Sequence, residues 1–169
     1  MQVFLSSDHR GFILKSKLTS DLAKTQLASG NQISIVDLGP NAYNQDDDFN
    51  DAAISVVKAI KENTRPGDEE PFGILICGSA IGVSIQANRF RGIRAAVITD
   101  IETAVPSREH DNANIICISA DRLARAKDPL ESEAEYENIL AIIEAFLNTP
   151  FSGKECYERR IKRLDEETI

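Results

Sequence analysis

The chain has 169 residues, of which 42% are hydrophobic and 27% charged, a composition typical of a folded globular protein with its own core. Its formal net charge is −8, and no block of Lys and Arg is long enough to track a phosphate backbone, so we expect no nucleic-acid partner. No run of about 18 apolar residues occurs, so we expect no membrane-spanning helix and no membrane partner. Residues 1–5 lack the basic and apolar regions of a signal peptide, and we therefore expect a cytoplasmic protein.

The first half of the chain alternates between patterns typical of strands and of helices. Residues 2–7 form an apolar run that predicts a strand, and residues 11–28 carry apolar side chains at helical spacing. Residues 33–38 predict a second strand, which is ended by Gly39 and Pro40. A polar, acidic loop follows, and then a helix whose apolar face comprises Ala52, Ala53, Val56, Val57 and Ile60.

The second half continues the alternation. Residues 72–77 are nearly all apolar, which is typical of a central parallel strand buried on both faces. The remaining expected elements are a helix ending at Asn88, a strand over 93–99, a helix over 101–109, a strand over 115–119, and helices over 133–148 and about 154–167. Strands separated by helices predict an α/β fold, a three-layer Rossmann-like domain with a five-stranded parallel sheet flanked by helices. We expect one domain over residues 1–169, with the last helix either solvated or covering a neighbouring subunit.

The cysteine pattern disfavours a structural metal site. The three cysteines, Cys77, Cys117 and Cys156, are widely spaced, and the chain has only two histidines. Because no C-x-x-C pair occurs, we expect no zinc site. Cys117 lies within the apolar run of residues 114–118, where a buried small hydrophobic residue is the simplest interpretation.

Polar residues that follow the predicted strands are candidate site residues, because ligands of open parallel sheets bind beyond the carboxyl ends of the strands. The segments concerned are Ser7–Gly11, Cys77–Gly82, Asp100 and Arg108–Asn112. They contain both histidines, His9 and His110. We therefore expect the two histidines to lie with Cys77 at one edge of the sheet.

Cys77 stands where a strand meets a predicted helix. A thiol at a helix N-terminus has a stabilised thiolate and a lowered pKa, which suits it to act as a nucleophile or a base. From the local sequence alone, an inert cysteine ending a buried strand is an equally good interpretation. The loop from Gly78 to Gly82 offers N–H groups to an anion, but it lacks the fingerprints of dinucleotide and nucleoside triphosphate sites.

Several motifs in order along the chain resemble those of the type B ribose-5-phosphate isomerases, whose fold the galactose-6-phosphate isomerase subunits share. The motifs are Ser7-Asp8-His9-Arg10-Gly11-Phe12, Gly73-Ile74-Leu75-Ile76-Cys77-Gly78-Ser79, Asn88, Gly92-Ile93-Arg94-Ala95-Ala96 and Arg108-Glu109-His110-Asp111-Asn112-Ala113-Asn114. The similarity runs from Val3 to about Ile161, and several motifs with matching separations are more specific than any single one. The resemblance implies an aldose–ketose isomerase for ribose 5-phosphate and ribulose 5-phosphate that needs no metal or other cofactor.

The resemblance also implies roles for individual residues. Cys77 would move a proton between C2 and C1 of the opened sugar through a cis-enediolate. Ser79 and backbone N–H groups between Gly78 and Gly82 would stabilise the developing oxyanion. His110 would open the furanose ring.

Further residues would bind the substrate. Asp8 would hold sugar hydroxyls, His9 would face the phosphate, Asp111 stands where an asparagine commonly contacts substrate, and Arg160 matches a phosphate-binding arginine. The family is dimeric or larger, so a homodimer or homotetramer with active sites shared between subunits is implied. An aldose–ketose isomerisation needs a base, oxyanion donors and an acid–base group for ring opening, and residues suited to all three are present.

The sequence departs from the family pattern at several positions. Ala80 replaces a glycine, which would tighten the loop, and Phe49 replaces a tyrosine that contacts substrate in the family. Cys156 replaces the first of two arginines that hold the phosphate in the family. The cations that could replace this arginine are Lys154, Arg159, Arg10 and Arg122.

Two other functions are compatible with these differences. The chain could isomerise a different sugar phosphate, such as a six-carbon one, because the altered positions line the expected sugar and phosphate pocket. It could also be a non-catalytic homologue that binds a sugar phosphate or supports a partner. Retention of Cys77, Ser79, Asp8 and His110 together argues against the second alternative, because a binding module needs no base.

Overall fold

The computed structural model describes residues 1–28, 30, 32–65, 67 and 69–166. Its centre is a parallel sheet of five strands in the order β2-β1-β3-β5-β4. The strands are β1 (Gln2–Ser7), β2 (Ser34–Asp37), β3 (Phe72–Cys77), β4 (Ala95–Val97) and β5 (Ile115–Ser119). This arrangement confirms the predicted α/β fold with a five-stranded parallel sheet.

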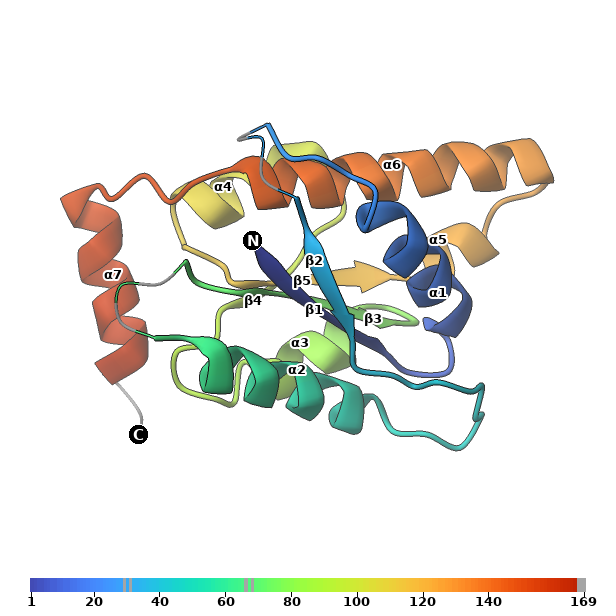
Figure 1. Cartoon of the computed structure of the whole chain (residues 1–169), viewed down its shortest axis with the longest axis horizontal. Coiled ribbons are helices and arrows are strands. Elements are labelled where there is room, and N and C mark those ends of the chain that lie inside the picture. Colours follow the sequence, from blue (N-terminus) through green and yellow to red (C-terminus); the bar gives the residue numbers. More distant parts are fainter. Residues whose placement is uncertain (29, 31, 66, 68, 167–169) are drawn as a thin grey trace.

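Helices cover both faces of the sheet, so the fold has three layers (Figure 1). The helices are α1 (Phe12–Leu22), α2 (Phe49–Asn63), α3 (Ile81–Ala87), α4 (Ile101–Glu109), α5 (Asp121–Ala124), α6 (Pro129–Asn148) and α7 (Glu155–Glu166). Buried side chains of α1, α4 and α6 form one core on the first face, and those of α2 and α3 form a second core on the other face.

The strands separate the two cores because successive side chains of a strand point to opposite faces. Leu5 and Ile74 face α1 and α6, whereas Phe4 and Leu75 face α2 and α3. Every residue of β3 is buried, as expected for a central strand. Gly73 is required within it, because a Cβ there would lie 2.6 Å from Val56 Cγ1 of α2.

The largest reductions from the expected element boundaries are in α1 and β4. Helix α1 ends at Leu22, because Thr25 and Gln26 occupy the positions at which an apolar face would have to continue. Strand β4 has only three residues, since its ladder to β5 stops at Val97. Residue 167, the expected end of the last helix, lies outside the described residues.

Helix α5 and the first turn of α6 were not predicted from the sequence. The side chain of Asp128 caps α6 by accepting a hydrogen bond from the Glu131 N–H, and Pro129 stands at the first helical position. Both are ordinary start signals of a helix, so the start of α6 was detectable.

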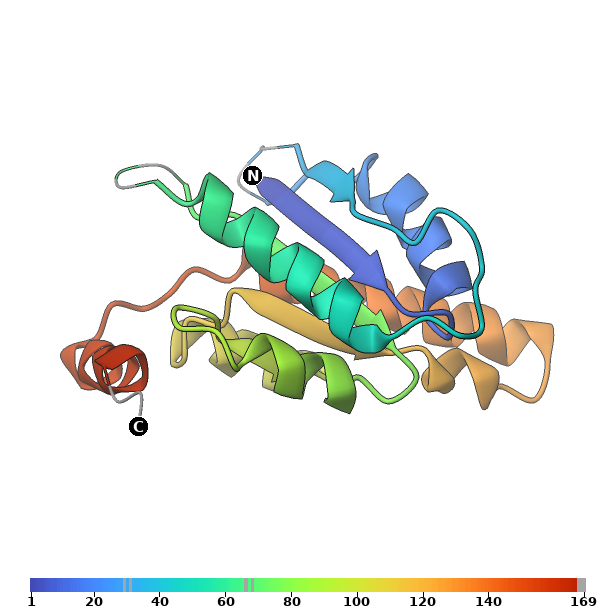
Figure 2. The same ribbon diagram turned by 90° about the horizontal axis from the view of Figure 1, so that it is seen from below.

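Helix α7 lies apart from the three layers. In Figure 2 the arrowhead of β1 points away from α7, so α7 is beyond the amino ends of the strands. None of its described side chains is buried. Among the described residues, no helix combines the length and apolarity needed to cross a membrane.

Candidate active site

Cys77 is the last residue of β3, and the residue is only 4% exposed. The Cys77 carbonyl accepts a hydrogen bond from the Ala120 N–H at 2.9 Å, and the Gly78 carbonyl accepts one from the Asp121 N–H at 3.0 Å. The backbone at Cys77 and directly after it is therefore bonded to the segment that follows β5. This fixes Cys77 at the carboxyl edge of the sheet.

The segment after Cys77 turns sharply into α3. Ala80 adopts a left-handed conformation with φ 68°, and its side chain is completely buried in the core shared with α2. The Ala80 methyl group therefore points into the core and does not narrow the exposed side of the loop, contrary to expectation. This conformation costs an L-residue about 1–2 kcal/mol relative to glycine. Ser79 is exposed, and its Oγ accepts a hydrogen bond from the Ile81 N–H at 3.3 Å.

Asp8 follows β1 at the same edge, with an exposed fraction of 6%. One carboxylate oxygen accepts hydrogen bonds from the backbone N–H groups of Arg10 and Gly11, at 3.0 and 3.1 Å. Burial raises the pKa of Asp8, and the hydrogen bond from Gly11 partly opposes that increase. A Cβ at Gly11 would lie 2.7 Å from Ile76 Cγ2, so the glycine allows this loop to pack against β3.

The imidazole of His9 is held by two residues that the sequence did not single out. Asp47 Oδ1 lies 2.7 Å from Nδ1 of His9 and also accepts a hydrogen bond from the His9 backbone N–H at 3.0 Å. The ring of Tyr43 meets the imidazole edge-on, with 6.3 Å between centroids. Because Nδ1 of His9 contacts Asp47, Nε2 is the ring nitrogen that is left to bind another group, such as a ligand. The only sequence signal for Asp47 was an acidic loop following a strand.

Arg10 lies on the backbone beside Cys77. Its Nη2 donates a hydrogen bond to Asp121 Oδ1 at 2.5 Å, and a Cβ at Gly78 would lie 2.7 Å from Arg10 Nε. On the other side of the loop, the ring of Phe49 covers Gly82, with carbons 3.0 Å from where a Cβ would stand. The absence of a Cβ at Gly78 and Gly82 therefore allows Arg10 and Phe49 to pack against the loop that follows Cys77, here called the thiol loop (residues 78–82). Arg10 places a positive charge next to this loop.

His110 lies at the opposite edge of the sheet, so the expectation that both histidines share one edge is wrong within a single chain. Helix α4 starts after the carboxyl end of β4 and runs back toward the amino ends, where His110 ends it. There the imidazole stacks on Tyr157 of α7, with centroids 4.5 Å apart and planes at 21°. Asp111 follows His110 and is exposed, and Arg160 places its Cζ 5.6 Å from the Tyr157 centroid.

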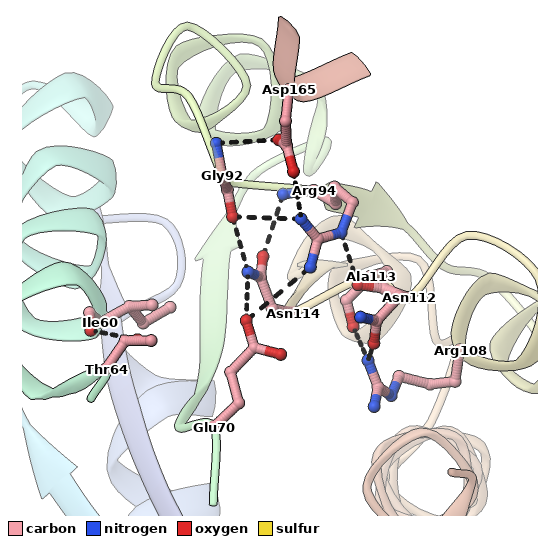
Figure 3. Close-up of polar contacts among 10 residues, drawn as sticks. All are labelled: Ile60, Thr64, Glu70, Gly92, Arg94, Arg108, Asn112, Ala113, Asn114 and Asp165. Carbon is pink, nitrogen blue, oxygen red and sulfur yellow. Dashed lines mark hydrogen bonds and ion pairs between the residues drawn. The ribbon is translucent and has the colours of Figure 1, made fainter. Parts of the chain in front are cut away.

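Two arginines hold the turn that follows His110 (Figure 3). Arg94 Nε donates to the Asn112 carbonyl at 2.7 Å, while Arg108 Nη1 donates to Asn112 Oδ1 at 2.9 Å and to the Ala113 carbonyl at 2.6 Å. Burial lowers the pKa of Arg108 to about 10, which leaves it charged at neutral pH. Asn112 adopts a left-handed conformation with φ 46°, and its hydrogen bonds with Arg94 and Arg108 hold it there.

The same network attaches α7 to the sheet. One carboxylate oxygen of Asp165 accepts a hydrogen bond from the Gly92 N–H at 3.2 Å, and the other lies 3.6 Å from Arg94 Nη1 (Figure 3). A cavity of about 430 Å³ lies beside this contact and is lined by residues that include Phe90, Asp111 and Leu164. Helix α7 therefore rests on the stack of Tyr157 on His110 and a few polar contacts instead of a packed apolar face.

The candidate phosphate-binding cations divide between the two edges. Lys154, Arg159 and Arg160 belong to α7 or its approach, at the amino edge. Arg10 and Arg122 are at the carboxyl edge, where Arg122 donates hydrogen bonds to Glu135 and, at 2.5 Å, to the Thr99 carbonyl. Arg122 is thus bound by α6 and by the segment that follows β4. In the part of the chain that the structure describes, no three His, Cys, Asp or Glu side chains gather as a metal site would require.

Comparisons with known proteins agree with one another. The model of the ribose/galactose isomerase family matches residues 3–164. A probable ribose-5-phosphate isomerase B of Mycoplasma genitalium is 36% identical over 162 residues, covering 96% of this chain and 92% of that protein. Ribose-5-phosphate isomerase B of Mycobacterium tuberculosis is 34% identical over 166 residues, covering 98% and 89% of the two chains.

Solved structures give the same result for the fold. The crystal structure of ribose-5-phosphate isomerase B from Mycoplasma genitalium with bound ribulose-5-phosphate has a TM-score of 0.78 and 34% sequence identity, covering 99% of this chain and 97% of that one. The ribose 5-phosphate isomerase of Thermotoga maritima has a TM-score of 0.77 and 36% identity, covering 98% and 97%. Both similarities extend over nearly the whole of the two chains.

Proposed function

The chain belongs to the ribose/galactose isomerase family, and on that premise we propose that it interconverts ribose 5-phosphate and ribulose 5-phosphate. The observation that carries the proposal is the set of groups around the end of β3. A thiol held by backbone hydrogen bonds has an exposed hydroxyl, Ser79, two residues later, and Asp8 and His9 follow the adjacent strand β1. The bound ribulose-5-phosphate of the Mycoplasma genitalium relative supports the same substrate here.

Cys77 acts as the base in the proposed reaction. Its sulfur takes the proton from C2 of the open aldose, and the electrons of the C–H bond form the enediolate while the C1 oxygen becomes negative. The proton then returns to C1. A second proton passes from the C2 hydroxyl to the negative C1 oxygen, so that C2 becomes the ketone and C1 becomes a hydroxymethyl group. Ser79 and the N–H groups between Gly78 and Gly82 donate hydrogen bonds to the enediolate oxygen, a role in which one donor is worth about 3 kcal/mol.

The remaining groups come from a second copy of the chain in this proposal. His110, Asp111 and Arg160 lie at the amino edge, and Cys77 lies at the carboxyl edge. A homodimer in which the amino edge of one subunit faces the carboxyl edge of the other brings them together. Exposed apolar side chains on α3, β4 and α4, which an interface would cover, support an oligomer: Ile81, Ile85, Val97 and Ile101. A homotetramer would be built from two such pairs.

Ring opening and phosphate binding follow from that assembly. His110 transfers the proton that opens the furanose, and Asp111 and Asp8 bind sugar hydroxyls. Arg160 of one subunit and His9 of the other hold the phosphate, and Arg10 contributes positive charge from the side of the thiol loop. Arg10 is already paired with Asp121, so its contribution is smaller than that of Arg160.

The proposal is tested by following ribulose 5-phosphate formation from ribose 5-phosphate, without added metal, for the wild type and for Cys77→Ala. We expect turnover to fall by a factor of about 10³ or more, because the base is removed. Cys117→Ala is the matched control, since Cys117 lies on the same core face of the neighbouring strand and burial raises the pKa of its thiol far above the usual range.

The control variant should keep most of the activity. Turnover that survives in Cys77→Ala would show that another group is the base. If the wild type is inactive on ribose 5-phosphate but isomerises a six-carbon sugar phosphate, the proposed substrate is wrong and the proposed reaction type stands. Inactivity on both would favour a non-catalytic homologue.

A further inference from the structure

The ring of Tyr157 stacks on the imidazole of His110, a contact that the sequence did not predict. The two rings come from different elements, the end of α4 and the first turns of α7. Their centroids are 4.5 Å apart and their planes differ by 21°, which is a stacked arrangement. The imidazole side chain remains 41% exposed, so one face of the ring is covered and its edges stay accessible.

The position of Tyr157 is set by contacts on both sides of it along the chain. Before α7, the N–H and Oγ of Ser152 donate hydrogen bonds to the Glu109 carbonyl, at 3.2 and 2.7 Å. Near the end of α7, Asp165 binds the Gly92 N–H. Because Glu109 directly precedes His110, the chain that leads to Tyr157 is bonded to the helix that carries the imidazole. The two rings are therefore held in register by the backbone as well as by their own contact.

Charged groups surround this stack. Lys154 Nζ and Arg160 Cζ lie 5.8 and 5.6 Å from the Tyr157 centroid, within the range of cation–π contacts. Glu109 Oε2 lies 3.9 Å from Nε2 of His110. Tyr157 thus contacts both the proposed ring-opening histidine and the proposed phosphate-binding arginine.

We propose that Tyr157 is a positioning residue for ring opening, which fixes the plane of the His110 imidazole and the place of Arg160 relative to it. This inference rests on the function proposed above. In ring opening, the bond between C1 and the ring oxygen O4 breaks, the O1 hydroxyl loses its proton to leave an aldehyde, and O4 gains a proton to become a hydroxyl. A proton carrier must reach O1 or O4 at hydrogen-bond distance, so the direction of the imidazole edge decides the rate.

Measurements with the two substrates distinguish ring opening from the proton transfer between C2 and C1. Ribulose 5-phosphate has its O5 esterified and its carbonyl at C2, so it cannot close a five-membered ring and binds already open. Exchange of solvent deuterium into C1 of ribulose 5-phosphate therefore reports on Cys77 and the enediolate without any ring opening. Turnover of ribose 5-phosphate, which starts from the furanose, needs both steps.

The experiment measures both rates for Tyr157→Leu, Tyr157→Phe and Leu164→Ala. For Tyr157→Leu we expect kcat with ribose 5-phosphate to fall roughly 10- to 100-fold, while deuterium exchange into ribulose 5-phosphate, measured at saturating substrate so that weaker phosphate binding does not affect it, changes by less than about twofold. Tyr157→Phe should restore kcat, because it keeps the ring face. Leu164→Ala, which shortens an exposed apolar side chain two turns further along α7, should alter neither rate.

Several results would overturn the proposal. Equal loss of both rates in Tyr157→Leu would mean that Tyr157 supports assembly of the whole site and not ring opening. Failure of Tyr157→Phe to restore kcat would mean that the hydroxyl acts and not the stack, and an unchanged Tyr157→Leu would remove the role altogether. A wild type with neither activity would instead reject the proposed function, and this inference with it.

Discussion

The two edges of the sheet differ in how they hold their functional groups. At the carboxyl edge, Cys77 and Asp8 are nearly buried, and backbone hydrogen bonds fix the loops that carry them. At the amino edge, His110 is 41% exposed on its side chain, and Arg160 belongs to a helix with no buried described residue. The first edge is part of the packed fold, whereas the second depends on a ring stack and a few polar contacts.

This difference corresponds to different chemical demands. The position of a base relative to the C–H proton must be correct to within about 0.5 Å, a precision that a strand end in a close-packed core provides. In the proposed assembly, the groups that bind the phosphate and open the ring must reach a substrate held by the other subunit, which their exposure allows. The proposed reaction requires groups from both edges, so it is tested most directly by inactivating each edge in a different chain.

The largest effect on turnover is expected when one chain has an inactivated carboxyl edge and its partner has an inactivated amino edge. Cys77→Ala and His110→Ala should each be nearly inactive alone. Co-expression of the two variants should restore about a quarter of wild-type turnover, because half of randomly paired dimers are mixed and each mixed dimer has one intact site. Purification through two different tags isolates the mixed dimer for the measurement.

The control for this experiment is the Cys77→Ala variant co-expressed with a second tagged copy of itself, which should stay inactive. If the mixed dimer of Cys77→Ala and His110→Ala shows no activity, the two residues do not act in a site shared between subunits.

A smaller effect is expected from the phosphate-binding cations of the two edges. Arg160→Ala should raise KM for ribose 5-phosphate by roughly 10- to 100-fold with a lesser change in kcat, since a charged hydrogen bond to the phosphate is lost. Arg10→Ala should raise KM less, because Asp121 already neutralises part of its charge. Steady-state kinetics of both variants decides the order, and a larger effect of Arg10→Ala would move the main phosphate contact to the carboxyl edge.

The smallest effects are expected on the free energy of unfolding. Variants at the two edges show how much each edge contributes to the stability of the fold. Gly11→Ala forces a Cβ to within 2.7 Å of Ile76 Cγ2 and should cost about 1–3 kcal/mol of unfolding free energy, or about 2–10 °C in Tm. Asp165→Ala loosens α7 and should leave Tm within about 2 °C, since no described α7 side chain is buried. Thermal denaturation followed by circular dichroism measures both, and an equal loss would mean that α7 is as integral to the fold as β1.

Much of the fold was predictable because its signals are local. The apolar run of β3 and the alternation of strands with helices indicated the parallel sheet, and the residues that follow β1 and β3 marked the carboxyl edge. The cap formed by Asp128 and Pro129 was present in the sequence and was missed. The burial of the Ala80 methyl group was not predictable, because it depends on which way a left-handed turn directs a single Cβ.

The sequence by itself determined the order of the elements, the sheet and the place of Cys77 and Asp8. Cys77 ends a strand and Asp8 directly follows one, so both must lie at the carboxyl edge of the sheet. Only the tertiary structure decided where His110 lies. Nine helical residues of α4 separate it from the end of β4 and carry the chain back by about 14 Å, at 1.5 Å per residue. The contacts of His110 with Tyr157 and of His9 with Asp47 join residues 47 and 38 positions apart, and such pairings depend on how whole helices and loops pack.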